Sequence, residues 1–171
     1  MSKEYEDEVT AAEEFLSLIQ SKDKKIRKHL LNTFLSGYNE AYSNTKNHFA
    51  KSNTENWYTT VILKALEAVK ECLKLSVSAK TNIESASVYL GRAFGNFLAV
   101  FEFGFASENF NPGSYRKYIV EDIDEIAKLS KSLKNFNASI IRNRIQRILK
   151  KNYTKISSSN QIFIREMGAK F

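Results

Sequence analysis

Proline, cysteine, histidine and glycine are all scarce in this chain of 171 residues. It has one proline, Pro112, one cysteine, Cys72, and six glycines. Its two histidines, His29 and His48, have no partner at the spacing of a metal site or a catalytic group. One cysteine excludes an internal disulfide. With so little proline, and no long run of alternating polar and apolar residues, the chain is predicted to be all-α.

Long uninterrupted apolar runs are missing too. The first ten residues, MSKEYEDEVT, lack the basic start and apolar run of a secretory leader. The longest apolar stretch, residues 88–106, contains Arg92 and Glu102, whose charges are costly in hydrocarbon. We therefore expect a buried helix and no membrane span. Together with the single cysteine, these features predict an intracellular, cytoplasmic protein.

Charge is abundant and unevenly distributed. The formal net charge is +7 and the isoelectric point is near 9.4. Residues 1–14 contain six acids and one lysine, whereas residues 126–171 contain eleven lysines and arginines and one acid, Glu166. A strongly basic end favours acidic partners such as nucleic acid.

Apolar residues recur at helical spacing in six segments, which predict a single compact bundle of five or six helices. The expected helices span about 4–20, 22–48, 55–75, 81–106, 115–136 and 138–153. Residues 1–156 are interpreted as one helical domain, built around the fourth helix. Residues 157–171 are expected to be a short tail packed on the bundle or on a partner, with Ser157 to Ser159 as a flexible link.

Local signals predict where three of these helices begin. Ser52 with Glu55, and Thr81 with Glu84, have the spacing of a capping box. Ser114, after the turn signal Asn-Pro-Gly, is expected to cap the fifth helix.

The fourth segment combines a wide apolar face with a narrow ridge of small residues. The apolar face consists of Ile83, Leu90, Phe94, Phe97, Leu98, Phe101 and Phe105. The ridge consists of Ser87, Gly91, Gly95 and Ala99, spaced four residues apart. Each glycine inside a helix costs about 1 kcal/mol relative to alanine. The ridge therefore predicts that another helix or a ligand approaches the backbone closely there.

The sixth segment carries the main functional signal. Basic residues share or border one face, about a quarter turn from an apolar stripe of Ile141, Ile145, Ile148 and Leu149. They are Arg144, Arg147, Lys150, Lys151 and Lys155. No acid occurs between Glu125 and Glu166. This pattern is typical of a helix that packs on a core and contacts a polyanion beside it.

A second basic cluster occurs at the start of the second segment. It consists of Lys24, Lys25, Arg27 and Lys28. Basic residues oppose the dipole at a helix start, so something other than helix stability favours them. We interpret this cluster as a second candidate contact for nucleic acid.

The sequence thus predicts a non-enzymatic nucleic-acid-binding protein, or a small helical subunit of a nucleoprotein complex, without cofactor or metal. The basic helix also fits a plain solvated face, or an anionic membrane surface. The main alternative is an assembly protein that self-associates or binds an acidic protein. In that case the acidic residues 1–14 of one copy would contact the basic helix of another.

Three other groups have a structural interpretation. Trp57, Tyr58, Tyr115 and Tyr118 are expected to be core or staple contacts rather than surfaces for stacking bases. The acids Glu121, Asp122, Asp124 and Glu125 are expected to form a solvated helix face with pairs such as Asp124 and Lys128, not a metal site. Cys72 is expected to be a buried thiol.

Overall fold

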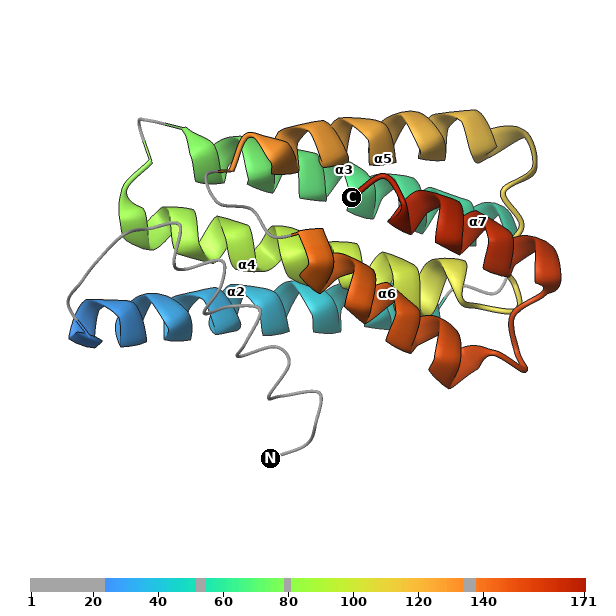
Figure 1. Ribbon diagram of the computed structural model, residues 1–171, viewed down its shortest axis with the longest axis horizontal. Helices are drawn as coiled ribbons and strands as arrows, with labels where there is room; N and C mark the ends of the chain where they lie inside the picture. Colours follow the sequence, from blue (N-terminus) through green and yellow to red (C-terminus); the bar gives the residue numbers. More distant parts are fainter. Residues whose placement is uncertain (1–23, 52–54, 79–80, 134–137) are drawn as a thin grey trace.

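The protein is a bundle of helices in this computed structural model, which describes residues 24–51, 55–78, 81–133 and 138–171 (Figure 1). The described residues form six α-helices and no strand: α2 (Lys24–Ala50), α3 (Glu55–Val77), α4 (Ile83–Ala99), α5 (Arg116–Lys131), α6 (Ala138–Asn152) and α7 (Ser158–Gly168). A π-helical segment, η2 (Val100–Phe105), continues α4, and a 3-10 turn, η3 (Gly113–Tyr115), precedes α5. The predicted all-α bundle is confirmed. The helix expected at 4–20 and the capping box at Ser52 lie outside the described residues.

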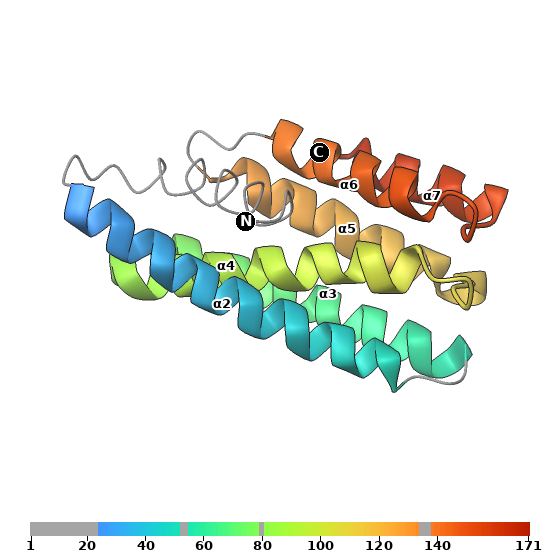
Figure 2. The ribbon, with the colours of Figure 1, turned by 90° about the horizontal axis from the view of Figure 1, so that it is seen from below.

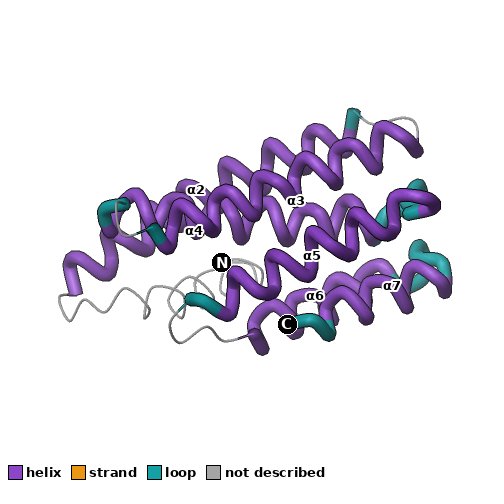
Figure 3. Tube along the Cα trace, turned by 90° about the horizontal axis from the view of Figure 1, so that it is seen from above, coloured by secondary structure: helices purple, strands orange, loops and turns teal. Residues whose placement is uncertain are grey.

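The helices form two groups with α5 between them. Figures 2 and 3 show α2, α3 and α4 on one side of the bundle and α6 and α7 on the other. The end of α2, the starts of α3 and α5 and the turn from α6 to α7 lie at the same end, on the right in Figure 1. We call this end the α6–α7 end.

Helices α2 and α4 contact each other backbone to backbone. A Cβ atom added at Gly91 would lie 2.1 Å from the carbonyl oxygen of Phe34, and one at Gly95 would lie 2.5 Å from that of Tyr38. Gly37 of α2 is equally close to the backbone of α4, and α2 continues through it without a break. The close approach predicted from the glycine ridge is confirmed, and the partner is a helix.

Two buried polar side chains along this contact form hydrogen bonds from one helix to the other. The hydroxyl of Ser87 donates a 2.6 Å hydrogen bond to the carbonyl oxygen of Leu30. The hydroxyl of Thr45 donates a 2.6 Å bond to the Asn96 side-chain oxygen. Because a buried polar group without a partner costs about 1–3 kcal/mol, these bonds fix the register of α2 on α4.

A series of phenylalanine rings forms the centre of the core. Centroid separations are 5.0 Å from Phe97 to Phe101, 4.9 Å from Phe101 to Phe105 and 5.2 Å from Phe105 to Phe163 of α7. The final residue, Phe171, lies 5.1 Å from Phe97. The C-terminal segment therefore packs on the bundle through apolar side chains in the middle of α7 and just after its end.

The start of α7 replaces the flexible link expected at Ser157 to Ser159. Ser157 is the N-cap, and its hydroxyl accepts a hydrogen bond from the backbone amide of Asn160 at 3.3 Å. The buried Asn160 side chain in turn donates a 2.8 Å bond to the carbonyl oxygen of Phe110. Serines that resemble a linker in sequence are thus a cap and the first turn of a helix.

Two other helix starts also differ from prediction. The N-cap of α4 is Asn82, whose side chain accepts from the Ser85 amide at 2.8 Å; asparagine is a stronger cap than the adjacent Thr81. No side chain caps α5, because the turn η3, with Gly113 at a φ of 47°, takes the place expected for a Ser114 cap. The apolar face predicted for α4 is buried except at Ile83, which is 45% exposed.

Candidate nucleic-acid interface

Helix α6 directs its basic residues to different sides of a buried stripe. Ile141, Ile145, Ile148 and Leu149 are all buried, as predicted. On one flank Lys151 faces η2, where its Nζ lies 3.4 Å from Oε1 of Glu102. On the other flank Lys150 lies in a groove beside α7. Lys151 and Lys150 therefore lie at opposite edges of the basic side of α6, one beside η2 and the other beside α7.

Glu102 joins three elements at the first flank. Its carboxylate contacts Lys151 of α6 and accepts a 2.5 Å hydrogen bond from the hydroxyl of Tyr42 on α2. Burial raises the pKa of the Tyr42 hydroxyl far above its ordinary value, and the bond to the carboxylate raises it further. The Glu102 side chain is only 13% exposed, so this flank of α6 is partly occupied by the protein itself.

The remaining basic residues of α6 differ in exposure. Arg144 is half-buried, whereas Arg147 is exposed, and both have interactions within the protein. Lys155, in the turn after α6, is exposed. Arg142 donates from Nη1 to the carbonyl oxygen of Phe171 at 3.4 Å, which ties α6 to the C-terminus. Arg147, Lys150 and Lys155 thus present exposed positive charge, and so does Lys151, whose side chain is 62% exposed despite its contact with Glu102.

The groove beside α7, which we call the α6–α7 groove, is an open hollow of about 480 Å³. Its lining consists of Gln146, Leu149, Lys150, Tyr153 and Arg165. Tyr153 is 60% exposed. Among the described residues, no carboxylate lies within ion-pair distance of Lys150 or Arg165. The groove thus combines an exposed ring with two cations.

The backbone around Tyr153 is held by α7. The side-chain amide of Gln161 donates to the carbonyl oxygens of Tyr153 and Ile156, at 3.2 and 3.0 Å. The amide of Lys155 donates to the carbonyl oxygen of Asn152 at 2.9 Å. These bonds position Tyr153 at the mouth of the groove.

Of the residues that line this groove, sequence reasoning placed only Lys150 in the candidate binding site. Gln146, Leu149, Lys150 and Tyr153 have the helical spacing of one face, which was visible in the sequence. Arg165 could not be placed there, because its position depends on α7 folding back along α6.

The second basic cluster is not beside the groove. Lys28 is exposed near the start of α2, at the opposite end of the bundle from the α6–α7 turn (Figure 1). The side chains of Lys24, Lys25 and Arg27 are not among those described. The structure therefore does not bring the two predicted clusters together.

The aromatic residues considered for stacking divide into two classes. Tyr58 is buried and packs 5.3 Å from the ring of Phe49, as expected of a core residue. Trp57, Tyr115 and Tyr118 are 44%, 41% and 56% exposed, so the expectation of core contacts holds only for Tyr58. All three exposed residues are near helix starts at the α6–α7 end.

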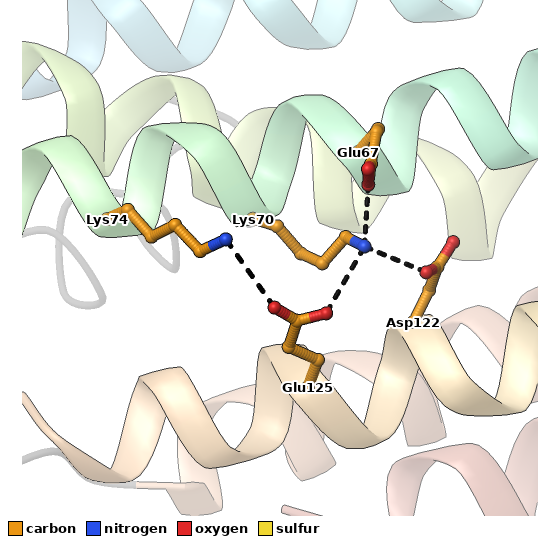
Figure 4. A network of polar contacts seen from close by, with 5 residues as sticks. All are labelled: Glu67, Lys70, Lys74, Asp122 and Glu125. Carbon is orange, nitrogen blue, oxygen red and sulfur yellow. Dashed lines mark hydrogen bonds and ion pairs between the residues drawn. The ribbon is translucent and has the colours of Figure 1, made fainter.

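The acidic cluster of α5 is not simply a solvated face. Figure 4 shows that Asp122 and Glu125 point toward Lys70 of α3, at 2.9 and 3.3 Å, and that Glu67 completes the set at 2.6 Å. Burial alone would lower the pKa of Lys70, but the three carboxylates outweigh it and raise that pKa. The hydrogen bond from Lys70 lowers the pKa of Glu125. This cluster joins α3 to α5.

Two further ion pairs join α5 to the C-terminal segment. Asp124 lies 2.5 Å from Nζ of Lys170, a partner other than the expected Lys128. Arg116 lies 3.0 Å from Glu166.

The free thiol of Cys72 is half-buried, and burial raises its pKa, which disfavours the reactive thiolate.

Comparison of the chain with protein-family models, curated proteins and solved structures finds no match. Among the described helices, none is both long enough and apolar enough to span a membrane.

Proposed function

We propose that the protein is a non-enzymatic nucleic-acid-binding protein, or a small helical subunit of a nucleoprotein complex, that contacts the phosphate backbone through α6. The observation that supports this proposal is that one side of α6 is apolar and buried while another side is basic and exposed. Its apolar stripe is buried, it contains no acid, and it exposes Arg147 and Lys150, with Lys155 directly after it.

The arrangement fits a polyanion because the exposed cations follow the outside of one helix. Their charges add to the attraction for phosphates regardless of base sequence. If four phosphates are neutralised, the affinity should fall about a hundredfold between about 50 and 200 mM salt.

Charge reversal at Arg147 and Lys155 tests the proposal. Both side chains are exposed and neither lines the α6–α7 groove, so the double variant Arg147→Glu, Lys155→Glu should fold normally. We expect it to weaken oligonucleotide binding at least about tenfold and to flatten the salt dependence, measured by fluorescence anisotropy.

The matched control is Lys64→Glu with Lys128→Glu. These exposed lysines of α3 and α5 give the same change in net charge outside α6. The control should bind almost as the wild type does. Equal weakening by both double variants would show a nonspecific effect of net charge, and no binding by the wild type would refute the proposal.

The alternative of an assembly protein has one observation in its favour. Leu75, Val77 and Ile83 are 36%, 44% and 45% exposed, and they flank the connection between α3 and α4. A second copy could cover them. Light scattering distinguishes the two proposals. A mass well above 19.6 kDa that falls in Val77→Glu, Ile83→Glu supports assembly through this patch, whereas a constant mass with oligonucleotide binding supports the first proposal.

A further inference from the structure

We infer that the α6–α7 groove binds one unpaired nucleotide of a single strand, with its base on Tyr153 and its phosphates on Lys150 and Arg165. The inference rests on the proposed function and adds to it a substrate class, because it selects single-stranded over duplex nucleic acid. The lining, the exposure of Tyr153 and the charge of the groove support it.

The lining provides each kind of contact that a nucleotide needs. The volume of about 480 Å³ lies within the range of small-molecule sites. Tyr153 offers a flat ring, and the buried Leu149 gives an apolar floor. Gln146 adds a side-chain amide that can both donate to and accept from a base edge. A nucleotide combines a flat apolar body, a polar edge and strong negative charge, which matches this lining.

Tyr153 is presented as a stacking surface. It is the most exposed large apolar or aromatic side chain among the described residues, at 60%. Its backbone is held by the bond from Gln161, so the ring starts from a fixed position. Bases stack on such rings with little sequence preference, because every base has a π-face.

Among the described residues, both cations of the groove lack the carboxylate partner that three other basic residues of this half of the bundle have. Lys151 contacts Glu102, Arg116 contacts Glu166 and Lys170 contacts Asp124. Within the described part of the chain, Lys150 and Arg165 have no such carboxylate. They come from two helices on the two sides of the groove, so a phosphate chain passing along it meets positive charge from both. An arginine can also bind a phosphate through two parallel hydrogen bonds.

Stacking on Tyr153 requires a base that is not already stacked in a duplex. Duplex bases are enclosed by their neighbours, and an aromatic wall can reach a base only when it is turned out of the strand or unpaired. A duplex could contact Lys150 and the exposed cations of α6 through its phosphates alone. The groove therefore predicts tighter binding of a single strand than of the same strand in a duplex.

The test compares a labelled thymidine or uridine oligonucleotide, alone or annealed to its complement, with the full chain by fluorescence anisotropy. Tyr153→Ala should weaken single-strand binding about tenfold, within the range for the loss of one stacked base, and should leave duplex binding unchanged. Tyr153→Phe should bind as the wild type does, because stacking needs the ring and not the hydroxyl. Tyr118→Ala is the matched control, since that ring is 56% exposed at the same end but outside the groove.

Salt dependence separates the stacking contact from the phosphate contacts. Lys150→Gln with Arg165→Gln should lower the slope of log K against log salt by about 1.4 for a single strand, whereas Tyr153→Ala should not change it. Ultraviolet crosslinking of the wild type to a thymidine oligonucleotide should map by mass spectrometry to the peptide that contains Tyr153. This readout needs no variant to fold.

Each failure has a separate meaning. If Tyr153→Ala weakens single strand and duplex equally, or has no effect and no crosslink forms at Tyr153, the groove inference is wrong and the proposed function survives. If Tyr118→Ala weakens binding as much as Tyr153→Ala, stacking is not confined to the groove and the assignment fails. If the wild type binds no oligonucleotide, or binds an acidic peptide through Lys150 and Arg165 instead, the inference and the proposed function both fall.

Discussion

Replacing Gly91 with alanine should force α2 and α4 apart. The new Cβ atom would lie 2.1 Å from the carbonyl oxygen of Phe34, and Cβ atoms essentially never come within 3.0 Å of such a neighbour. Because the obstacle is backbone, no side-chain rotation relieves it. The two helices must therefore separate by roughly 1 Å, which loses dispersion contacts along their whole interface.

The change in the free energy of unfolding caused by Gly91→Ala is the balance of two opposing effects. Overpacking of a rigid core costs up to about 3 kcal/mol or more, while replacing glycine by alanine inside a helix gains about 1 kcal/mol. The free energy of unfolding should therefore fall by about 2 kcal/mol. For a chain of this size that corresponds to a melting temperature lower by about 4 to 8 °C. Chemical and thermal denaturation followed by circular dichroism measure both quantities.

Gly168→Ala is the matched control at the other side of the bundle. There the nearest atom to an added Cβ is Cδ1 of Ile145, at 3.3 Å, which is the tip of a side chain that can move. This variant should change stability by less than about 1 kcal/mol. The reasoning about the backbone contact is refuted if Gly91→Ala is as stable as the wild type, or if the two variants are equally destabilised.

Two further predictions concern the dependence of stability on pH. Lys70→Met leaves Glu125 without its buried ammonium and should cost about 1 to 2 kcal/mol at neutral pH. The folded pKa of Glu125 is lowered, so this contribution to stability is present above its unfolded pKa of about 4.3 and is lost as pH falls. The loss of stability in Lys70→Met, measured by urea denaturation, should therefore shrink in acid. A loss of stability that does not depend on pH would contradict this account. The raised pKa of Tyr42 gives stability that is present below the unfolded value of about 10 and is lost as pH rises. The wild type should therefore lose thermal stability above about pH 10 more steeply than Tyr42→Phe, with Tyr118→Phe as an exposed control that should follow the wild type.

The fold was predictable where the sequence pattern involves only residues that are close together in the chain. The apolar stripe of α6 and the glycine ridge of α4 repeat at helical spacing, so their faces could be assigned before any partner was known. The ridge predicted a close neighbour but not its identity, because the matching Gly37 lies far away in the sequence. The cap of α4 was misplaced by one residue, because the prediction followed the capping-box spacing of Thr81 and Glu84 and not the stronger capping preference of Asn82.

Features set by tertiary packing were missed. No pattern indicated that the backbone would widen into the π-helical segment η2. Lys70 is a lysine near the apolar face of α3, and its partners Asp122 and Glu125 are 52 and 55 residues further along the chain. Local sequence cannot show that such a charge is buried and satisfied.

The α6–α7 groove could be predicted from the sequence only in part. The basic residues of α6 were found because no acid interrupts them. Adjacent residues in the sequence nevertheless have different surroundings: Lys151 contacts Glu102, while Lys150 faces α7. The groove exists only because the chain reverses after Tyr153, within a serine-rich stretch that resembled a linker.

The two sides of the bundle are joined in mechanically different ways. Backbone atoms of α2 and α4 are in contact at Gly91, so any sliding of one helix along the other meets fixed carbonyl groups. The α6–α7 hairpin instead meets its neighbours through the ends of side chains such as Phe163 and Phe171, which tolerate small shear movements by changing rotamer. Sliding of one helix along another is therefore obstructed most directly between α2 and α4, where backbone meets backbone.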